Sequence, residues 1–434
     1  MSSFKKLDVA VIGGGLGGLA AALSLRRQGH KVTIYERRSF TAEVGASITC
    51  AANGTRWLYE WGCDMSIGNP VVQQKLVMRD WKTGKPQAIY PMENYKEKWG
   101  YESNMFHRQD LHLMLLTAAT STEGEGEPVT VHVDYVCETL DHEEGTATFT
   151  NGKTVKADLI IGADGIRSKV RTNIGVIPDM TSAPQTCFRC NVRTEDVKRL
   201  GLVDYSLDPA IQFWGGFEVP DINKYFKIVM CSVSGGTKTS FYCFMPTEYA
   251  LQHVSEGFQF KEVSPEEILV GAYKDLLDKD CVDLLKNSIE RMPWRLYLHK
   301  PYPYWVKGKI GLLGDAAHPM MPHQSQGACQ AFEDAAVLGM VFSKDYPQFT
   351  EDPKAGLAMY ERIRKPRATR IQSASRRATD DLHERIGFTT VFSDGKTKEG
   401  EPDETGWIKL TMHEVNTWDP ATLLREYALE TAQV

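Results

Sequence analysis

The sequence predicts an α/β protein of two domains, followed by a helical C-terminal part. One domain is expected to hold a parallel sheet, and the other to be rich in strands of a separate sheet. Three stretches support this prediction, because each begins as a short apolar run and ends in a polar turn: residues 7–18, 159–171 and 311–334. Such runs are typical of buried parallel strands. At 434 residues the chain is also long for one hydrophobic core.

Composition excludes several classes of protein. Hydrophobic residues make up 42% and charged residues 24%, which are ordinary globular values. The net charge of −6 argues against a nucleic-acid partner and gives no reason to expect an anionic membrane surface. No apolar run is long enough to predict a transmembrane helix. Nine cysteines, spread from Cys50 to Cys329, indicate free thiols in a reducing compartment, so we expect a cytoplasmic protein.

The first stretch carries the pattern G-x-G-x-x-G as Gly13, Gly15 and Gly18. A strand is predicted over 7–12, a helix over 19–28 and a second strand over 31–35, closed by Glu36. Glycines at these positions permit a tight turn and a close approach of the backbone to a pyrophosphate, and the carboxylate suits ribose hydroxyls. The motif alone is weak and fits a glycine-rich packing turn, but its context predicts a Rossmann-type dinucleotide site.

Further elements follow in chain order. Asn53 is predicted to cap a helix that runs to residue 61. Strands are expected within 74–92, and Arg108 begins a helix, where it forms either a surface ion pair or a ligand contact. More strands are expected at 129–133, 137–141 and 147–150, before the second apolar run at 159–162. The residues that follow that run, Gly162-Ala-Asp-Gly-Ile-Arg167, again place a carboxylate at the end of a strand.

From residue 184 to about residue 293 strand-like segments dominate, and an amphipathic helix is predicted over 265–287. A helix from 353 is expected to end or kink at Pro366. The basic run from Arg362 to Arg370 is interpreted as a solvated helix face. A loop is expected at 394–405. The first domain is then expected to comprise residues 1–73, 101–183 and 295–375, the second residues 74–100 and 184–294, and the tail residues 376–434.

The third stretch, residues 311–334, is the centre of the predicted site. An apolar strand ends at Gly314, Asp315 follows it, and Gln326-Gly327 opens a helix after a turn rich in small residues and proline. A carboxylate beside a helix N-terminus suits a polyol and an anion, because it accepts hydroxyl hydrogen bonds while the free N–H groups face negative charge. A routine strand-to-helix turn is the alternative.

Together the three motifs resemble those of the FAD-dependent aromatic hydroxylases, single-component flavoprotein monooxygenases that include salicylate and 3-hydroxybenzoate hydroxylases. The resemblance covers residues 7 to about 375, and the form D-A-A-H-P-x-x-P-x-x-x-Q-G that begins at Asp315 is highly specific. It implies that the first motif binds the ADP half of FAD, that Asp164 contributes to FAD and pyridine-nucleotide interaction, and that Asp315 binds the ribityl chain. It also implies that Arg108 contacts FAD.

The same resemblance places Pro322, Gln326 and Gly327 beside the isoalloxazine ring. We assign Ala46 and Ala328 to the cofactor site as well. Arg37 contacts a phosphate or is solvated surface charge. Only one dinucleotide fingerprint is present, so NAD(P)H is expected as a co-substrate without a domain of its own. The resemblance further implies that reduced flavin reacts with O2 to a C4a-hydroperoxide, which favours an electron-rich phenol as the small aromatic substrate.

The substrate side is less constrained by the sequence. Arg189 either pairs with a phenolate or carboxylate or forms a salt bridge at a strand. Phe213 and Trp214 are candidates for an aromatic wall or for core packing, and Tyr225 is a candidate phenolic donor. His323 has either a proton-transfer or a structural role. No metal site is predicted, because Cys187 and Cys190 form a single C-x-x-C and no ligand cluster accompanies His323.

Other functions remain open at this stage. Epoxidation of an alkene or oxidation of an indole uses the same flavin motifs. Halogenation is disfavoured because the sequence has no W-x-W. A flavin-binding protein without catalysis is disfavoured by the intact set of three motifs. The sequence leaves open the substrate, the regiochemistry, the choice between NADH and NADPH, the oligomeric state and any chemistry of the tail.

Overall fold

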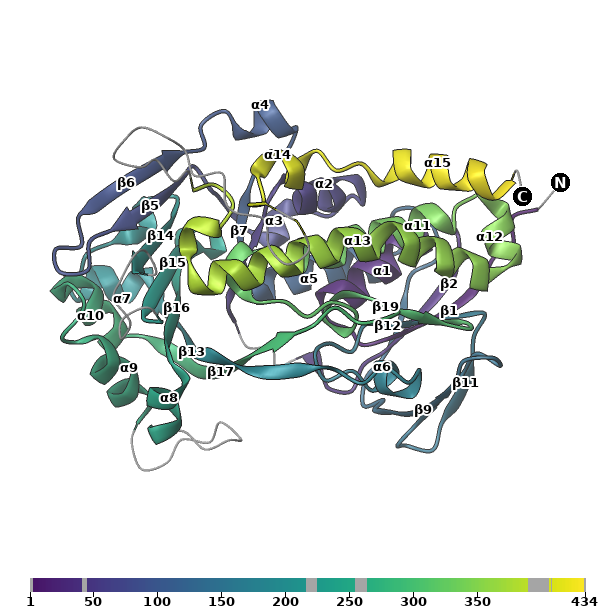
Figure 1. Ribbon diagram of the computed structural model, residues 1–434, viewed down its shortest axis with the longest axis horizontal. Helices are drawn as coiled ribbons and strands as arrows, with labels where there is room; N and C mark the ends of the chain where they lie inside the picture. Colours follow the sequence, from purple (N-terminus) through teal and green to yellow (C-terminus); the bar gives the residue numbers. More distant parts are fainter. Residues whose placement is uncertain are drawn as a thin grey trace.

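The computed structural model describes residues 3–40, 45–215, 225–253, 264–388, 406 and 408–432. Its first sheet has six strands in the order β18-β19-β12-β1-β2-β8 (Figure 1). Their bounds are β18 (Val306–Lys307), β19 (Ile310–Leu312), β12 (Leu159–Gly162), β1 (Asp8–Ile12), β2 (Lys31–Tyr35) and β8 (Thr130–His132). The pairing is parallel except between β18 and β19.

The register of this sheet brings the three sequence motifs together. Ile12 of β1 is opposite Gly162 of β12, which in turn is opposite Leu312 of β19. Because all three strands run in the same direction, the turns that follow them leave the sheet at one edge, where ligands bind in open α/β sheets. The predicted strands over 7–12 and 31–35 are confirmed within one residue.

The second sheet has seven strands in the order β17-β13-β16-β15-β14-β5-β6. Their bounds are β17 (Ile289–His299), β13 (Met180–Arg193), β16 (Lys238–Pro246), β15 (Lys227–Val233), β14 (Ala210–Gly215), β5 (Lys75–Arg79) and β6 (Pro86–Pro91). Only β14 and β5 pair in parallel. One face packs against three helices, α8 (Thr247–His253), α9 (Pro265–Tyr273) and α10 (Lys279–Lys286), around a core that includes Phe188, Trp214 and Phe241.

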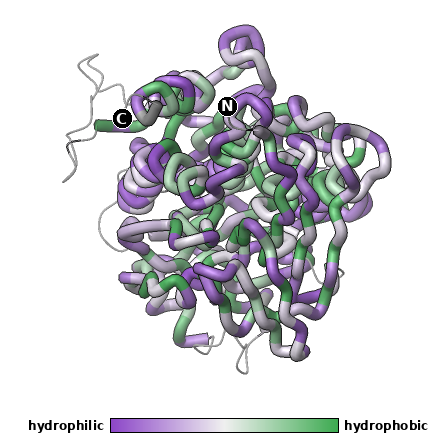
Figure 2. The backbone as a smooth tube through the Cα atoms, turned by 90° about the vertical axis from the view of Figure 1, so that its right-hand side faces the viewer, coloured by the Kyte–Doolittle hydropathy of each residue, from purple (hydrophilic) through white to green (hydrophobic). Residues whose placement is uncertain are grey.

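Two small sheets complete the strands: β11-β10-β9, with bounds Thr154–Lys156, Thr146–Phe149 and Cys137–Asp141, and β3-β7-β4, with bounds Ser47–Cys50, Asn104–His107 and Val71–Val72. The helices not yet named are α1 (Leu16–Arg27), α2 (Ala52–Glu60), α3 (Met65–Gly68), α4 (Tyr95–Trp99), α5 (Arg108–Thr120), α6 (Lys169–Asn173), α7 (Thr194–Arg199), α11 (Gly327–Val341), α12 (Pro347–Glu351), α13 (Pro353–Asp380), α14 (Met412–Asn416) and α15 (Pro420–Ala432). In Figure 2 hydrophobic and hydrophilic colours alternate along many segments, as expected where elements have one buried face.

Two predictions about helices were wrong, and one alternative of a third is excluded. The helix predicted over 265–287 is two helices, because Ser264 and Asp278 each cap a new N-terminus. Asn53 does not cap α2, which has Ala51 at its N-cap, and its amide is used elsewhere. Of the two outcomes expected at Pro366, an end of the helix is excluded, since α13 continues to Asp380.

The C-terminal part lies along the first domain. The long helix α13 crosses the view in Figure 1, and α15 runs alongside it. The expectation that the basic run of α13 is solvated was wrong for Arg364, Arg367 and Arg370, which are buried, whereas Arg362 is exposed. The loop predicted at 394–405 lies outside the described residues. Within the described residues, no helix has the length and apolar character required to span a bilayer.

Candidate flavin and substrate site

The turn after β1 has the backbone that a dinucleotide fingerprint requires. Gly13 has φ of +109°, and a Cβ on Gly18 would lie 2.0 Å from the carbonyl oxygen of Gly13. Helix α1 and the turn after β1 approach each other so closely that no larger residue fits at Gly18 without displacing the turn. At Gly15, by contrast, a Cβ would meet nothing within 4 Å. The backbone there faces open space, as it must if a pyrophosphate is to approach it.

Glu36 at the end of β2 holds this turn. Its Oε2 accepts a hydrogen bond from the Gly14 N–H at 2.7 Å, and its Oε1 accepts one from the Arg38 N–H at 3.0 Å. Arg37 is exposed, and Arg38 rather than Arg37 lines the adjoining cavity. The carboxylate therefore shapes the glycine loop and keeps further lone pairs for a ligand hydroxyl.

Asp315 lies in a short 3-10 turn, η4 (Gly314–Ala316), directly after β19. Its carboxylate makes no hydrogen bond to any described residue, and its side chain is exposed to the cavity. Burial by the surrounding protein raises the pKa of Asp315, whereas the nearby charges of His318, Arg108 and Arg171 act to lower it. Asp315 is thus an acceptor that awaits donors from a ligand.

The start of α11 offers a complementary donor. Gln326 is 1% exposed, and its Oε1 accepts a hydrogen bond from Asn53 Nδ2 at 2.9 Å. Asn53 Nδ2 also donates to Glu333 Oε1 at 2.7 Å, so the carboxylate fixes which way both amides point. This orientation leaves Gln326 Nε2 buried without a partner among the described residues. A Cβ on Gly327 would meet open space, so donors and free backbone converge where a ring carbonyl of a cofactor fits.

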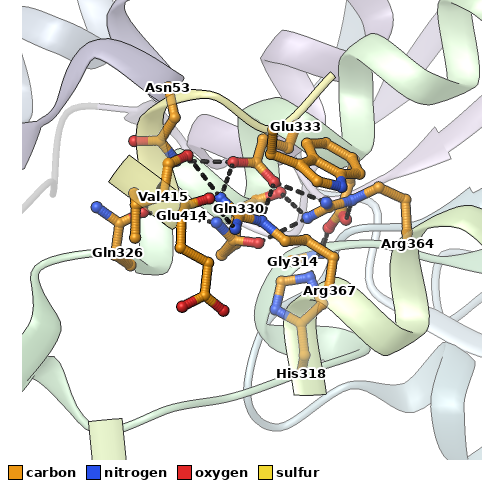
Figure 3. Close-up of polar contacts among 12 residues, drawn as sticks. Asn53, Gly314, His318, Gln326, Gln330, Glu333, Arg364, Arg367, Glu414 and Val415 are labelled. Carbon is orange, nitrogen blue, oxygen red and sulfur yellow. Dashed lines mark hydrogen bonds and ion pairs between the residues drawn. The ribbon is translucent and has the colours of Figure 1, made fainter. Parts of the chain in front are cut away.

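A buried ionic network supports this helix start (Figure 3). Arg364 of α13 donates to Glu333 at 2.6 Å and to Asp334 at 2.7 Å, and all three side chains are fully buried. Asp334 also accepts from the Gly314 N–H at 2.9 Å and lies 2.6 Å from His318 Nε2. The network therefore ties the backbone beside Asp315 to the helix that begins at Gly327.

Arg367 extends the network into the C-terminal segment. Its guanidinium pairs with Glu333 at 3.2 Å and donates to the carbonyl oxygens of Glu414 at 3.0 Å and Val415 at 2.8 Å. The ring of Trp418 lies 4.7 Å from the Arg364 guanidinium. The tail, to which the sequence assigned no chemistry, thus closes the ionic core under the site.

One cavity of about 580 Å³ joins the two domains at this place. On the nucleotide side it is lined by Gly15, Arg108, Asp315, Pro322, His323, Gln326, Gly327 and Ala328, which were all predicted from sequence. Its other wall is the seven-stranded sheet. Alternate residues on five strands line it: Cys187 and Arg189, Ile211 and Phe213, Val229 and Cys231, Tyr242 and Phe244, Trp294 and Leu296. The period of two shows that one face of these five strands looks into the cavity.

Strand alternation also corrects one predicted substrate residue. Trp214 follows Phe213 in β14, so it points to the opposite face, where its indole N–H donates to Asp278 at 3.1 Å in the core beneath α10. The assignment of Trp214 to the substrate wall was therefore wrong, whereas Phe213 lies on that wall. Tyr225 is not among the described residues that line the cavity, and its role as a phenolic donor stays a prediction.

Four other predicted residues lie behind the cavity wall. Gly13 and Gly18 form the turn described above. Asp164 accepts hydrogen bonds from the Ser168 hydroxyl at 2.5 Å and from the Lys169 N–H at 2.7 Å, so it organises the start of α6. Ala46 accepts a backbone hydrogen bond from Arg108 at 2.8 Å and so positions the arginine that does face the cavity.

His323 is buried beside Phe244, with ring centroids 4.9 Å apart. Burial lowers the pKa of His323 well below its usual value, and the charges of Lys227 and Arg385 lower it further. Its ring is therefore neutral at pH 7. Within the described residues no three His, Cys, Asp or Glu side chains gather as metal ligands, and all nine cysteines are unpaired thiols.

Two groups of residues around the site carry no local sequence signal. Asn53, Glu333 and Arg364 meet only through tertiary structure, although the carboxylate pair Glu333-Asp334 inside an apolar helix was a visible anomaly. Arg385, beyond the last predicted motif, also lines the cavity. Its position depends on the turn after α13, which no periodic pattern indicated.

By its fold and its cavity the protein is of the class that holds a dinucleotide against a parallel sheet and presents it to a second ligand. Comparisons with known proteins define the class further. A family model described as an FAD binding domain matches residues 6–375. Hispidin-3-hydroxylase of Neonothopanus nambi is 32% identical over 396 residues, covering 86% of this chain and 89% of that protein. 3-hydroxybenzoate 6-hydroxylase 1 of Aquipseudomonas alcaligenes is 29% identical over 392 residues, covering 88% of this chain and 90% of that protein.

Solved structures share the fold. CtdE, determined in complex with FAD and a substrate, aligns with a TM-score of 0.75 at 20% identity and covers 99% of both chains. HpxO of Klebsiella pneumoniae, determined with FAD and uric acid, aligns with a TM-score of 0.68 at 22% identity, covering 87% of this chain and 89% of that one. The protein belongs to the family of FAD-dependent aromatic hydroxylases.

Replacing Glu36 with alanine is expected to weaken FAD binding by about 1–3 kcal/mol, because it removes both the Gly14 partner and an acceptor for a ribose hydroxyl. Fluorescence titration of the apoprotein with FAD measures the change. Glu123→Ala, in an exposed loop, is the matched control and should bind FAD as the unaltered protein does. Equal affinities for the two variants would exclude this role for Glu36.

Proposed function

We propose that this protein is a monooxygenase that consumes NADH or NADPH and O2 and hydroxylates an electron-rich, phenolic small molecule at its bound FAD. The observation that carries the proposal is the continuity of one cavity, from the glycine turn and Asp315 to an aromatic-lined sheet face. A cofactor held at the first end presents its ring to a substrate held at the second. The family membership of the chain supports the same reaction class.

The described residues fit FAD at the first end. Glu36 and the free backbone at Gly15 suit the adenosine and pyrophosphate, Asp315 suits ribityl hydroxyls, and Gln326 and Gly327 suit the carbonyl edge of the ring. When bound, reduced FAD supplies with O2 an electrophilic oxygen atom for transfer to the substrate. The protein's contribution is to bind, to orient and to exclude water.

Arg189 is the residue best suited to hold an ionised phenol. It lines the cavity, its guanidinium stacks on Trp294 at 4.1 Å from the ring centroid, and its Nε is buried without a partner among the described residues. A permanent cation lowers the pKa of a bound phenol and so favours the phenolate, which is the more nucleophilic form.

The nicotinamide cofactor has no second fingerprint to bind it, since G-x-G-x-x-G after a strand occurs once. We therefore propose that NADH or NADPH delivers hydride in a transient encounter. Purified FAD-loaded protein should oxidise NADH or NADPH slowly without a substrate and faster with a phenolic substrate. One oxygen atom of 18O2 should be found in the product. Panels of phenols, alkenes and indoles decide among the reactions. If only alkenes or only indoles gave a product, the proposed activity would be epoxidation or indole oxygenation instead of hydroxylation of a phenol.

Arg189→Gln should lower product formation and shift the pH optimum upward, towards the pKa of the free phenol, because the bound phenol loses its stabilising cation. FAD content should not change. The pH profile of product formation measures the effect. Arg193→Gln, an exposed arginine of the same strand, is the control. An unaltered profile in Arg189→Gln would make Arg189 a structural residue.

A further inference from the structure

Arg385 brings a charge into the substrate end of the cavity from outside the segment that the family model matches. It follows the short turn η6 (Leu382–Glu384) after α13, ten residues beyond the end of that match at residue 375. Its side chain is 5% exposed and lines the cavity together with Phe213 and Ser325. The C-terminal part of the chain therefore contributes to the wall of the substrate chamber.

The guanidinium of Arg385 is incompletely satisfied. It donates to the carbonyl oxygen of Ile386 at 2.9 Å and to the hydroxyl of Ser325 at 3.3 Å. An arginine has five N–H donors, so three remain without a partner in the part of the chain that the structure describes. Its guanidinium carbon, Cζ, lies 5.2 Å from the ring centroid of Phe213 and 5.8 Å from the ring centroid of Phe388. Apart from these ring faces it has little to offset its charge.

Two arginines that are more deeply buried, Arg364 and Arg26, are compensated more fully. Arg364 has two carboxylates, and Arg26 donates six hydrogen bonds to backbone carbonyls. No Asp or Glu among the described residues forms an ion pair with Arg385. Burial lowers the pKa of Arg385 to about 10, so the group is still a cation at neutral pH. A buried charge without a counterion is costly, and an anionic ligand would offset that cost.

The surroundings of Arg385 are positive as well. Lys227 is 1% exposed and donates to the Thr379 carbonyl oxygen at 3.0 Å, and His323 is influenced by the charges of both Lys227 and Arg385. Both cations face the neutral imidazole from different elements, β15 and the turn after α13. This end of the chamber thus has a positive potential, in contrast to the carboxylate of Asp315 at the cofactor end.

We propose that Arg385 binds an anionic group of the substrate, of the carboxylate kind, while Phe213 contacts the aromatic ring that carries it. The proposal rests on the proposed function, since it names the substrate class of the same site. Arg385 then determines specificity, and Arg189 acts on the reacting phenol. A planar carboxylate matches the fork of unused N–H donors, which a neutral group cannot replace.

The test titrates FAD-loaded protein with benzoate and with benzamide, its neutral counterpart, while flavin absorbance and heat of binding are recorded without NAD(P)H. Unaltered protein should bind benzoate more tightly than benzamide. Arg385→Gln should weaken benzoate binding about tenfold or more, leave benzamide binding unchanged and keep its FAD. The benzoate affinity of Arg385→Lys should lie between those of the unaltered protein and Arg385→Gln. Arg193→Gln should bind benzoate as the unaltered protein does.

Several outcomes would overturn the proposal. Equal affinities for benzoate and benzamide in the unaltered protein would do so without any variant, even if Arg385→Gln fails to fold. A benzoate affinity that depends on Arg189 and not on Arg385 would place the anion elsewhere. Chloride is tested in parallel, and a site that binds chloride but shows no preference for benzoate is a halide site only. A protein that hydroxylates nothing yet selects benzoate contradicts the proposed function and not this inference.

Discussion

Replacing Arg364 with methionine is expected to lower the free energy of unfolding by about 3–5 kcal/mol. The change leaves Glu333 and Asp334 buried without the cation they share, and desolvated carboxylates without a partner are strongly unfavourable. FAD retention should fall with stability, because the same network fixes the Gly314 backbone and, through Asn53, the Gln326 amide. This is the largest stability effect that we expect from a single substitution.

Urea denaturation of both proteins measures the difference, with Arg362→Met as the control. Arg362 lies on the same helix, but its side chain is 44% exposed and its partner Glu430 is 59% exposed, so its loss should cost less than about 1 kcal/mol. Similar losses in the two variants would contradict the role of the network.

The pH dependence of the same measurement has a definite sign. Burial alone would raise the pKa of Asp334, but His318 and Arg364 outweigh it and lower that pKa to about 2. A carboxyl group whose pKa is depressed in the folded state contributes stability above its ordinary pKa of 3.8 and loses it as the pH falls towards 2. The difference in the free energy of unfolding between Arg364→Met and the unaltered protein should therefore decrease as the pH falls from 3.8 towards 2.

Replacing Asp315 with alanine is expected to raise the dissociation constant of FAD by about 10–100-fold. Asp315 has no hydrogen-bond partner among the described residues and faces the cavity, so its removal leaves a ligand's hydroxyl donors unpaired without disturbing a contact of the fold. Substrate-stimulated NAD(P)H oxidation should then yield hydrogen peroxide in place of hydroxylated product, because the misplaced ring no longer meets the substrate.

Flavin fluorescence titration and peroxide assay give the two readouts. Asp179→Ala is the matched control, since Asp179 is 62% exposed and forms a surface ion pair with Lys300. Wild-type FAD content together with full coupling in Asp315→Ala would exclude the assignment of Asp315 to the flavin.

The nucleotide half could be predicted from sequence because its signals are local. Each motif is a strand followed by a turn, and parallel strands bring such turns to one edge, where Ile12, Gly162 and Leu312 indeed lie in register. The substrate half could not be predicted in the same way. Adjacent residues of a strand point to opposite faces, so Phe213 and Trp214 looked alike in sequence and lie on different sides of the sheet.

Long-range packing decided the remaining differences. Pro366 should cost its helix about 3 kcal/mol, but the helix buries Ile363 and Arg364 on one side of the proline and Ala368 and Ile371 on the other, and this packing outweighs the lost hydrogen bond. The arginines of the same helix looked like a solvated face because their acidic partners lie on another helix and in the tail. No window of sequence contains both halves of such a pair.

The carbonyl groups of Glu414 and Val415 that satisfy Arg367 have a consequence for biosynthesis. They follow Arg367 by roughly 50 residues in the sequence. At a synthesis rate of about 5–20 residues/s, they are added roughly 2–10 s after the arginine. Until then a nascent chain has the complete cofactor motifs and the ion pairs beneath them, but Arg367 lacks the two carbonyl acceptors. The network under the cofactor motifs is therefore completed only after this later segment has been synthesised.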